Sequence, residues 1–257
     1  MIHETRAMLL AGSLALCAVS MPVTAAAQGA TRPPRAARAA KPYTLNVKAS
    51  DGFVTLTVKT VNVSLATLAA DLSTQLHAKV NVSQSLEKDL LTLDFTDAPL
   101  EGAIVSFAPR VLIDYEVRRD RRPAVQAIHL LAAVDENPPA NTTDKGSSMG
   151  LMIEGNTEDS TDPKAEDPLK ISGDRNGLTA SVKKQRLSTV AMALGDILGV
   201  PVDLSYDSAE MVDAEFSNLP AEDAVTTLSP SLTLLVRADL NLADRRPLRL
   251  SVTAPNR

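Results

Sequence analysis

The chain has 257 residues, of which 44% are hydrophobic and 22% are charged, with a formal net charge of −5. This balance is typical of globular proteins and supplies enough apolar residues for two small cores. Aromatic residues make up only 3% and tryptophan is absent, which argues against nucleic-acid binding by base stacking, and the acidic balance disfavours phosphate binding.

The N-terminus predicts a secretory signal peptide over residues 1–27. Arg6 provides the positive end, Met8 to Val19 is an apolar run too short to cross a bilayer, and Ala25 to Ala27 offers a small-residue cleavage site. We therefore expect export to the periplasm, with cleavage near Ala27.

The single cysteine of the chain lies in the predicted signal peptide. Cys17 is the only cysteine, and the bulky Leu16 directly before it disfavours lipoprotein processing. The mature chain is therefore expected to have no disulfide and no cysteine nucleophile. It also has no later apolar run of transmembrane length.

A basic segment over residues 28–42 follows the signal. It has three prolines and no acid, so it cannot bury apolar area and is expected to be a disordered arm. Two interpretations remain open, a solvated linker or an arm that touches cell-wall polymer or lipid head groups.

A first folded module is predicted over residues 43–132. Apolar residues alternate with polar ones in its strands, and Leu65, Leu68, Leu72 and Leu76 recur at helical spacing after the N-cap candidate Ser64. The expected elements are one long or two short strands in 43–63, a helix over 65–76, strands at 79–82 and 91–95, a helix from Asp97 to Pro109 with Pro99 in its first turn, and strands at 111–117 and 124–131.

An acidic linker is predicted over residues 133–170. Ala133 to Leu169 contains nine acids and two lysines and is rich in Asn, Thr, Ser and Pro. This composition is typical of a flexible connection without a packed core.

A second module over residues 171–257 repeats the first. Leu65 corresponds to Leu187, Phe95 to Phe216, and the Asp-Arg-Arg-Pro sequence at Asp120 recurs at Asp244. Its expected elements are strands at 178–182, 202–204, 214–216, 232–236 and 248–252, with helices over 187–198 and from Asn218 to Pro230. An internal duplication of this kind favours two copies of a small binding module over a single enzyme.

Each module resembles the short N-terminal periplasmic domain shared by secretins and TonB-dependent transducers. The resemblance is carried by Leu-x-x-Leu-x-x-x-Leu helices and by the helix starts Asp97-Ala-Pro-Leu-Glu101 and Asn218-Leu-Pro-Ala-Glu222. It implies an α+β fold in which two similar small modules each pack two helices on two- and three-stranded sheets. It also implies function by protein–protein contact, although no receptor barrel or secretin pore accompanies the modules.

Catalytic, cofactor and metal sites are not predicted. His77 and His129 lie in different parts of the first module and are interpreted as surface or strand-edge histidines. The chain has neither a Gly-x-Ser-x-Gly motif nor a glycine-rich phosphate loop. We therefore expect no enzymatic activity.

Two features are candidates for partner docking. Dense positive charge lies on the predicted turn before the last strand of each module, where it could bind an acidic protein or the acidic linker of this chain, or simply protect a strand edge. The last strand of each module could also pair with a partner strand through an open edge. The candidate docking residues are Arg118, Arg119, Arg121, Arg122, Ile128, Arg245, Arg246 and Val252.

The predicted function is that of a non-enzymatic periplasmic adaptor or accessory of a secretion, pilus or TonB-linked signalling assembly. Its partner would be a secretin, a TonB-dependent receptor or an anti-sigma-type regulator, with no nucleic acid involved. The alternatives are a small-ligand binder or hydrolase with a site between the modules, and a cell-wall-binding protein. The oligomeric state is left open.

Overall fold

The computed structural model describes residues 42–50, 53–119, 121–139, 168–204, 206 and 208–254. All of them belong to one compact unit, residues 41–257. The predicted signal peptide, nearly all of the basic arm and residues 140–167 of the predicted acidic linker lie outside the described residues.

The front half, residues 42–139, contains six strands and two helices. Its elements are β1 (Thr44–Ser50), β2 (Phe53–Ser64), α1 (Leu65–Leu76), β3 (Lys79–Val82), β4 (Leu90–Pro99), α2 (Leu100–Ile104), β5 (Arg110–Arg118) and β6 (Arg121–Leu131).

The back half, residues 168–254, has the same order of elements. They are β7 (Leu169–Asp174), β8 (Gly177–Arg186), α3 (Leu187–Leu198), β9 (Val202–Asp203), β10 (Met211–Leu219), α4 (Ala221–Leu228), β11 (Leu232–Asp239) and β12 (Asp244–Val252). The sequence pattern did not predict β7, which begins inside the segment assigned to the linker.

Local signals place the first helix of each half correctly. The Ser64 hydroxyl accepts a hydrogen bond from the Thr67 N–H and caps α1 as expected. His77 and Gly199 end α1 and α3 in the left-handed conformation, at φ 54° and 66°. The second helices begin later than expected, because the strand runs on to Pro99 in one half and to Leu219 in the other.

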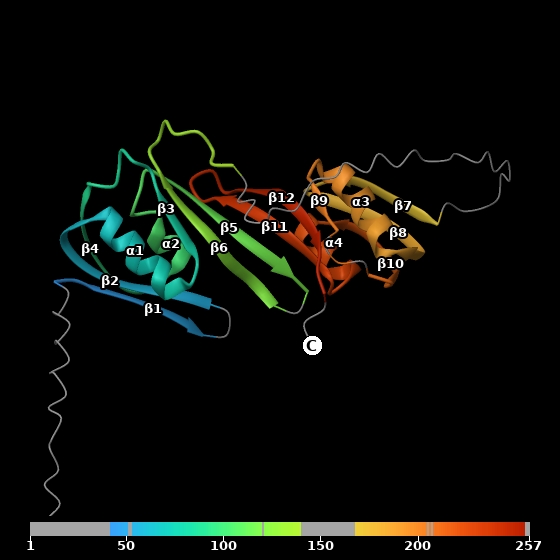
Figure 1. The fold of residues 1–257 in the computed structure, drawn as a ribbon, viewed down its shortest axis with the longest axis horizontal. Coiled ribbons are helices and arrows are strands. Elements are labelled where there is room, and N and C mark those ends of the chain that lie inside the picture. Colours follow the sequence, from blue (N-terminus) through green and yellow to red (C-terminus); the bar gives the residue numbers. More distant parts are fainter. Residues whose placement is uncertain are drawn as a thin grey trace, which may run out of the picture. The chain divides into compact units, whose positions relative to one another are not determined.

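The fold class inferred from the sequence is wrong. The described strands form three sheets, in the orders β1-β2-β4, β10-β8-β7 and β3-β6-β5-β11-β12-β9. The third sheet contains six strands and includes both halves, so the protein does not consist of two separate modules with small sheets of their own. Figure 1 shows β5 and β11 side by side at its centre.

The pairing of β5 with β11 is antiparallel and nearly symmetric. Tyr115 lies opposite Val236, and these two residues occupy equivalent positions in the two repeats. Both strands are mostly buried along their length. A sheet edge with buried, unpaired backbone groups is unfavourable, and pairing the equivalent edges of the two halves removes that cost.

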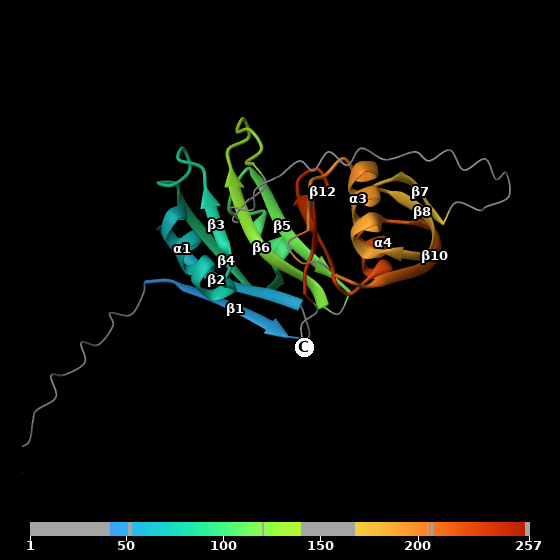
Figure 2. The same cartoon turned by 45° about the vertical axis from the view of Figure 1, so that its right-hand side comes forward.

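Each half places its helices between two sheets. In the front half, α1 contacts β1 and β2 of the small sheet and β3 of the six-stranded sheet, and α3 and α4 bridge the corresponding sheets in the back half. Figure 2 shows the helices lying between the strands in this way. Each half has a core of aliphatic side chains, with Ala238 joining the front core and Val117 joining the back core.

Candidate functional site

The six-stranded sheet has two chemically different faces. Along β5, the side chains of Val111, Ile113 and Tyr115 enter the front core on the helix side. The alternating residues, such as Leu112 and Asp114, point to the opposite side because successive residues of a strand face opposite ways. We call this opposite side the polar face.

A buried ionic cluster lies at the centre of the polar face. Arg237 of β11 donates from Nε to Asp114 Oδ1 at 2.6 Å and from Nη2 to Asp114 Oδ2 at 2.8 Å. The ring of His129 in β6 contacts Asp114 Oδ2 at 3.2 Å through Nε2. Asp114, His129 and Arg237 are only 1%, 2% and 7% exposed. The fork of Arg237 therefore satisfies both carboxylate oxygens in a site from which water is largely excluded.

The environment of Asp114 favours its ionised form. Burial alone raises the pKa of this carboxyl group, but hydrogen bonds from Arg237 and His129, together with their charge, outweigh burial and hold the pKa below its usual value. Neighbouring backbone completes the site, since Arg237 also donates to the carbonyls of Pro138 and Pro139.

This lowered pKa predicts a loss of stability in acid. Because the folded-state pKa of Asp114 lies below its unfolded value of 3.8, its contribution is present above that pH and is lost as pH falls through the folded pKa. The difference in unfolding free energy between wild type and Asp114→Asn should therefore shrink below pH ~3.8. Urea unfolding of both proteins from pH 7 to pH 2 measures this difference in free energy. A difference that stays constant over this range would contradict a lowered pKa of Asp114.

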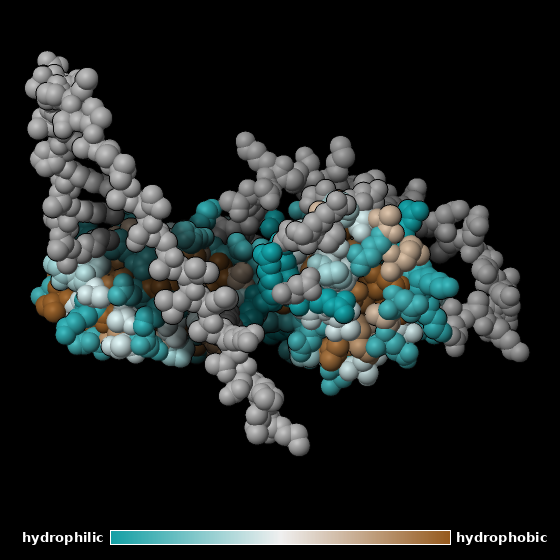
Figure 3. All heavy atoms as spheres, turned by 90° about the horizontal axis from the view of Figure 1, so that it is seen from below, coloured by the Kyte–Doolittle hydropathy of each residue, from teal (hydrophilic) through white to brown (hydrophobic). Residues whose placement is uncertain are grey.

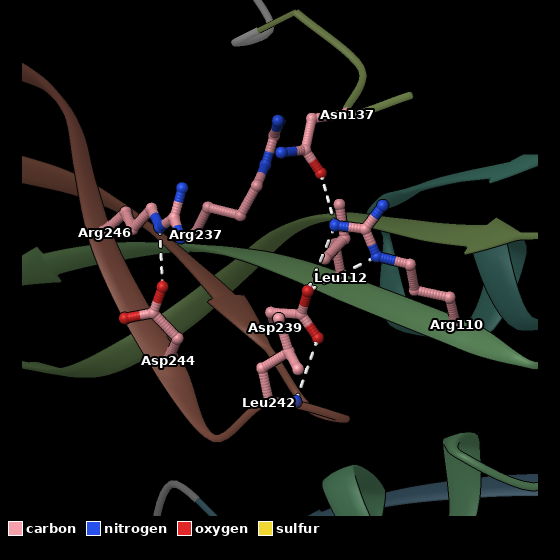
Figure 4. Close-up of a pocket in the computed structure, with 8 residues that line it drawn as sticks. All are labelled: Arg110, Leu112, Asn137, Arg237, Asp239, Leu242, Asp244 and Arg246. Carbon is pink, nitrogen blue, oxygen red and sulfur yellow. Dashed lines mark hydrogen bonds and ion pairs between the residues drawn. The ribbon is translucent and has the colours of Figure 1, made fainter. Parts of the chain in front are cut away.

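A second ionic group lies beside the cluster. Arg110 donates to Asp239 at 3.2 Å and to the Asn137 side chain at 2.6 Å, while Arg246 pairs with Asp244 (Figure 4). Hollows of about 410 and 260 Å³ lie on the same face, one next to His129 and the other next to Asp114. Acids and bases lie side by side on this face, and Arg249, which lines the hollow next to Asp114, has a buried Nε without a hydrogen-bond partner.

A different kind of hollow lies on the helix side of the sheet, where the two halves meet. It has a volume of about 390 Å³ and is lined by Phe53, Leu100, Glu101, Tyr115, Arg122 and Arg245, among others. We call it the junction hollow. Leu100 and Tyr115 are buried, whereas the Phe53 side chain is 64% exposed, so the hollow offers apolar surface beside cations.

The polar groups of the junction hollow come from both halves. Arg245 of β12 pairs with Glu222 in its own half at 3.2 Å and with Glu101 of α2 at 3.4 Å. Its guanidinium also lies over the Tyr115 ring. The Tyr115 hydroxyl donates to Glu101 at 2.6 Å, and burial together with this carboxylate raises the pKa of Tyr115 well above its usual value. Tyr115 is therefore neutral at physiological pH.

The Arg122 side of the junction hollow carries positive charge, and no acid of the described residues forms an ion pair with it. The Arg122 guanidinium lies 3.9 Å from the centre of the Phe53 ring. Arg119, Arg121 and Arg122 are all exposed, and none has an ion-pair partner among the described residues. Arg118 differs, because it pairs with Glu116 on the same strand.

The sequence-predicted docking residues do not come together in one place. Arg119, Arg121 and Arg122 lie at the turn between β5 and β6, and Arg245 joins Arg122 in the junction hollow, whereas Arg246 lies on the polar face. Ile128 and Val252 are 0% and 1% exposed.

The strand that carries Ile128 is not an open edge at this residue, and the strand that carries Val252 is covered just before it. Residues Ala127 to Leu130 of β6 pair with β3, and Leu250 and Ser251 of β12 pair with β9. A partner strand therefore has no free backbone to pair with in these stretches.

Sequence reasoning missed the buried cluster. His129 was interpreted as a surface or strand-edge residue, but it lies in the interior of the sheet beside Asp114. One signal was present, since Asp114 is an acid in the middle of the apolar strand Val111 to Val117. Arg237 gave no comparable signal, because its partner is far away in sequence.

Figure 3 shows hydrophobic and hydrophilic residues interspersed on the coloured part of the face that it presents. Among the described residues, no helix is long and apolar enough to cross a membrane. No group of three or more His, Cys, Asp or Glu side chains in that part of the chain is arranged to hold a metal ion.

Comparison of the chain with family models, with curated proteins and with solved structures finds no match. The resemblance to secretin and TonB short N-terminal domains therefore stays a prediction based on the sequence pattern.

Proposed function

We propose that this protein is a non-enzymatic periplasmic adaptor that docks a protein partner of an envelope assembly in the junction hollow. One observation supports this most: exposed apolar surface at Phe53 meets the cation of Arg122, which has no ion-pair partner among the described residues, in a hollow that both halves line. Aromatic and arginine side chains are the residue types that contribute most to protein interfaces.

The chemistry of the polar face supports binding more than catalysis. Both ring nitrogens of His129 are engaged, Nε2 by Asp114 and Nδ1 by the Asn81 side chain at 3.2 Å. A general base needs a ring nitrogen within reach of the proton that it removes. Asp114 is likewise held by both nitrogens of the Arg237 fork. The cluster thus fits a structural role that joins the two halves.

Docking in the junction hollow predicts a large effect of charge reversal at Arg122. Arg122→Glu should weaken partner binding at least about tenfold at low salt, because a steering cation is replaced by an anion. A single cysteine at Pro123 (Pro123→Cys), an exposed residue that lines the hollow, provides the handle to find that partner and leaves Phe53 in place, since the only native cysteine lies in the predicted signal peptide. A thiol-reactive cross-linker on intact cells traps the neighbour, and binding is then measured with purified proteins.

Lys59→Glu is the matched control for charge, because Lys59 is also an exposed cation of the front half but lies outside the junction hollow. It should leave the affinity unchanged. Equal cross-linking from a cysteine at exposed Val61, or equal affinity of Arg122→Glu and wild type, would contradict docking at this place.

A second candidate function is the binding of a small polar ligand on the polar face. The hollow of about 410 Å³ beside His129 favours it, because Asn81, Ser83 and Asp135 supply polar groups around it. If a ligand co-purifies with the protein, Ser83→Val should then weaken its binding. Mass spectrometry of the native protein measures the fraction of protein that carries the ligand. Wild-type protein that carries no such ligand would count against this candidate.

A further inference from the structure

The hollow of about 260 Å³ beside Asp114 is lined by residues of both halves. Lys79 of β3 and Arg249 of β12 line it, with Glu116 of β5 and Leu235 of β11 between them. In the six-stranded sheet, β6, β5 and β11 separate β3 from β12 (Figure 1). Two basic side chains therefore meet the same hollow from strands on opposite sides of it. We call it the Arg249 hollow.

Arg249 brings to this hollow a buried hydrogen-bond donor that has no acceptor. Its Nε atom is buried and has no hydrogen-bond partner among the described residues. Leu235 lies directly opposite Arg249 in the pairing of β11 with β12, and an aliphatic side chain cannot accept a hydrogen bond. A guanidinium keeps its charge at any physiological pH, and a buried donor without a partner is unfavourable. An anionic acceptor at this place would satisfy both its charge and its free N–H.

The acids that line the Arg249 hollow are already engaged by other cations. Asp114 is held by both nitrogens of the Arg237 fork. Glu116 pairs with Arg118 of the same strand. By contrast, the lysine and the arginine on the two sides of the hollow have no ion-pair partner among the described residues. Positive charge is thus in excess here, and a hollow lined by one excess sign of charge attracts ions of the other sign.

We propose that the Arg249 hollow binds a small organic dianion, with one carboxylate on Arg249 and the other on Lys79. The planar fork of a guanidinium matches one carboxylate, whereas an ammonium serves the other as a point charge. The partly exposed aliphatic side chain of Leu235 lies between the two cations and fits an apolar middle of the ligand. Short aliphatic dicarboxylates have this chemistry.

The test is isothermal titration calorimetry of the full chain with succinate and with adipate. At least one of the two should bind saturably, and more tightly than acetate or inorganic phosphate, each of which presents a single anionic group. Arg249→Gln and Lys79→Gln should each raise the Kd of the dicarboxylate about tenfold or more, because each removes one charge-assisted contact.

Lys59→Gln is the matched control, because Lys59 is an exposed cation of the front half that lies outside this hollow, and it should leave the Kd unchanged. If Arg249→Gln fails to fold, Lys79→Gln decides by itself, because Lys79 is exposed. The proposal is overturned if neither dicarboxylate binds saturably at millimolar concentration, if inorganic phosphate binds as tightly, or if Lys79→Gln leaves the Kd as it was. Docking in the junction hollow is independent of this site, so Arg122→Glu should not change the affinity for the dicarboxylate.

Discussion

Replacing Arg237 by leucine should destabilise the protein by about 3–5 kcal/mol at pH 7, because it leaves Asp114 as a buried charge without its main partner. Asp114 is 1% exposed, and Arg237 supplies two of the hydrogen bonds that hold it. The unfolding free energy from urea titration measures the loss. A loss near zero would mean that the pair does not exist as an ionised couple in solution.

A double substitution separates the lost pairing from the lost packing. Asp114→Leu copies the residue at the equivalent position of the back half, Leu235. We expect Asp114→Leu combined with Arg237→Leu to be more stable than Arg237→Leu alone, since no uncompensated carboxylate then remains. Arg246→Leu is the control, because its 60% exposed side chain makes a surface ion pair that contributes about 0–1 kcal/mol.

Leu234→Pro should disturb both halves and not only the one that contains it. Leu234 is 0% exposed and pairs with Val117 of β5 on one side and with Leu250 of β12 on the other, away from the register shift between Leu235 and Val236. Proline removes a ladder N–H and is confined to edge strands or bulges, so we expect a cost of roughly 3 kcal/mol or more. Hydrogen exchange measured by mass spectrometry should show faster exchange in β5 and β6 as well as in β11.

The exchange of the front half is the decisive observation in that experiment. Suppose that β5 and β6 kept their wild-type protection against hydrogen exchange while β11 lost its own. The shared sheet would then contribute nothing to the stability of the front half. Val134→Pro serves as the control, because Val134 is 92% exposed and lies outside the strands, and it should change exchange only near itself.

Several elements could be predicted because their signals are local. The heptad-like run of leucines and the Ser64 cap place α1 at Leu65–Leu76, and the same pattern places α3 at Leu187–Leu198. These signals depend on residues within one or two turns of each other. The second helices were placed too early, because the left-handed residues Asp97 and Asn218 bend the strands without ending them.

Only part of the candidate site could be predicted from the sequence. The charged turn drew attention to Arg122 and Arg245, which the fold does bring into one hollow. Phe53 and Tyr115, which provide its apolar surface, carried no distinguishing pattern. Their importance comes from contacts with residues far away in sequence, such as Arg245 over the Tyr115 ring.

Apart from β7, the amino-acid sequence alone determined the order of the elements and the repetition of that order, since apolar spacing, caps and prolines act between near neighbours. Only the tertiary structure decided that the halves share a sheet, because the match of β5 to β11 depends on two strands more than a hundred residues apart. That pairing buries Asp114 with Arg237 and forms the junction hollow.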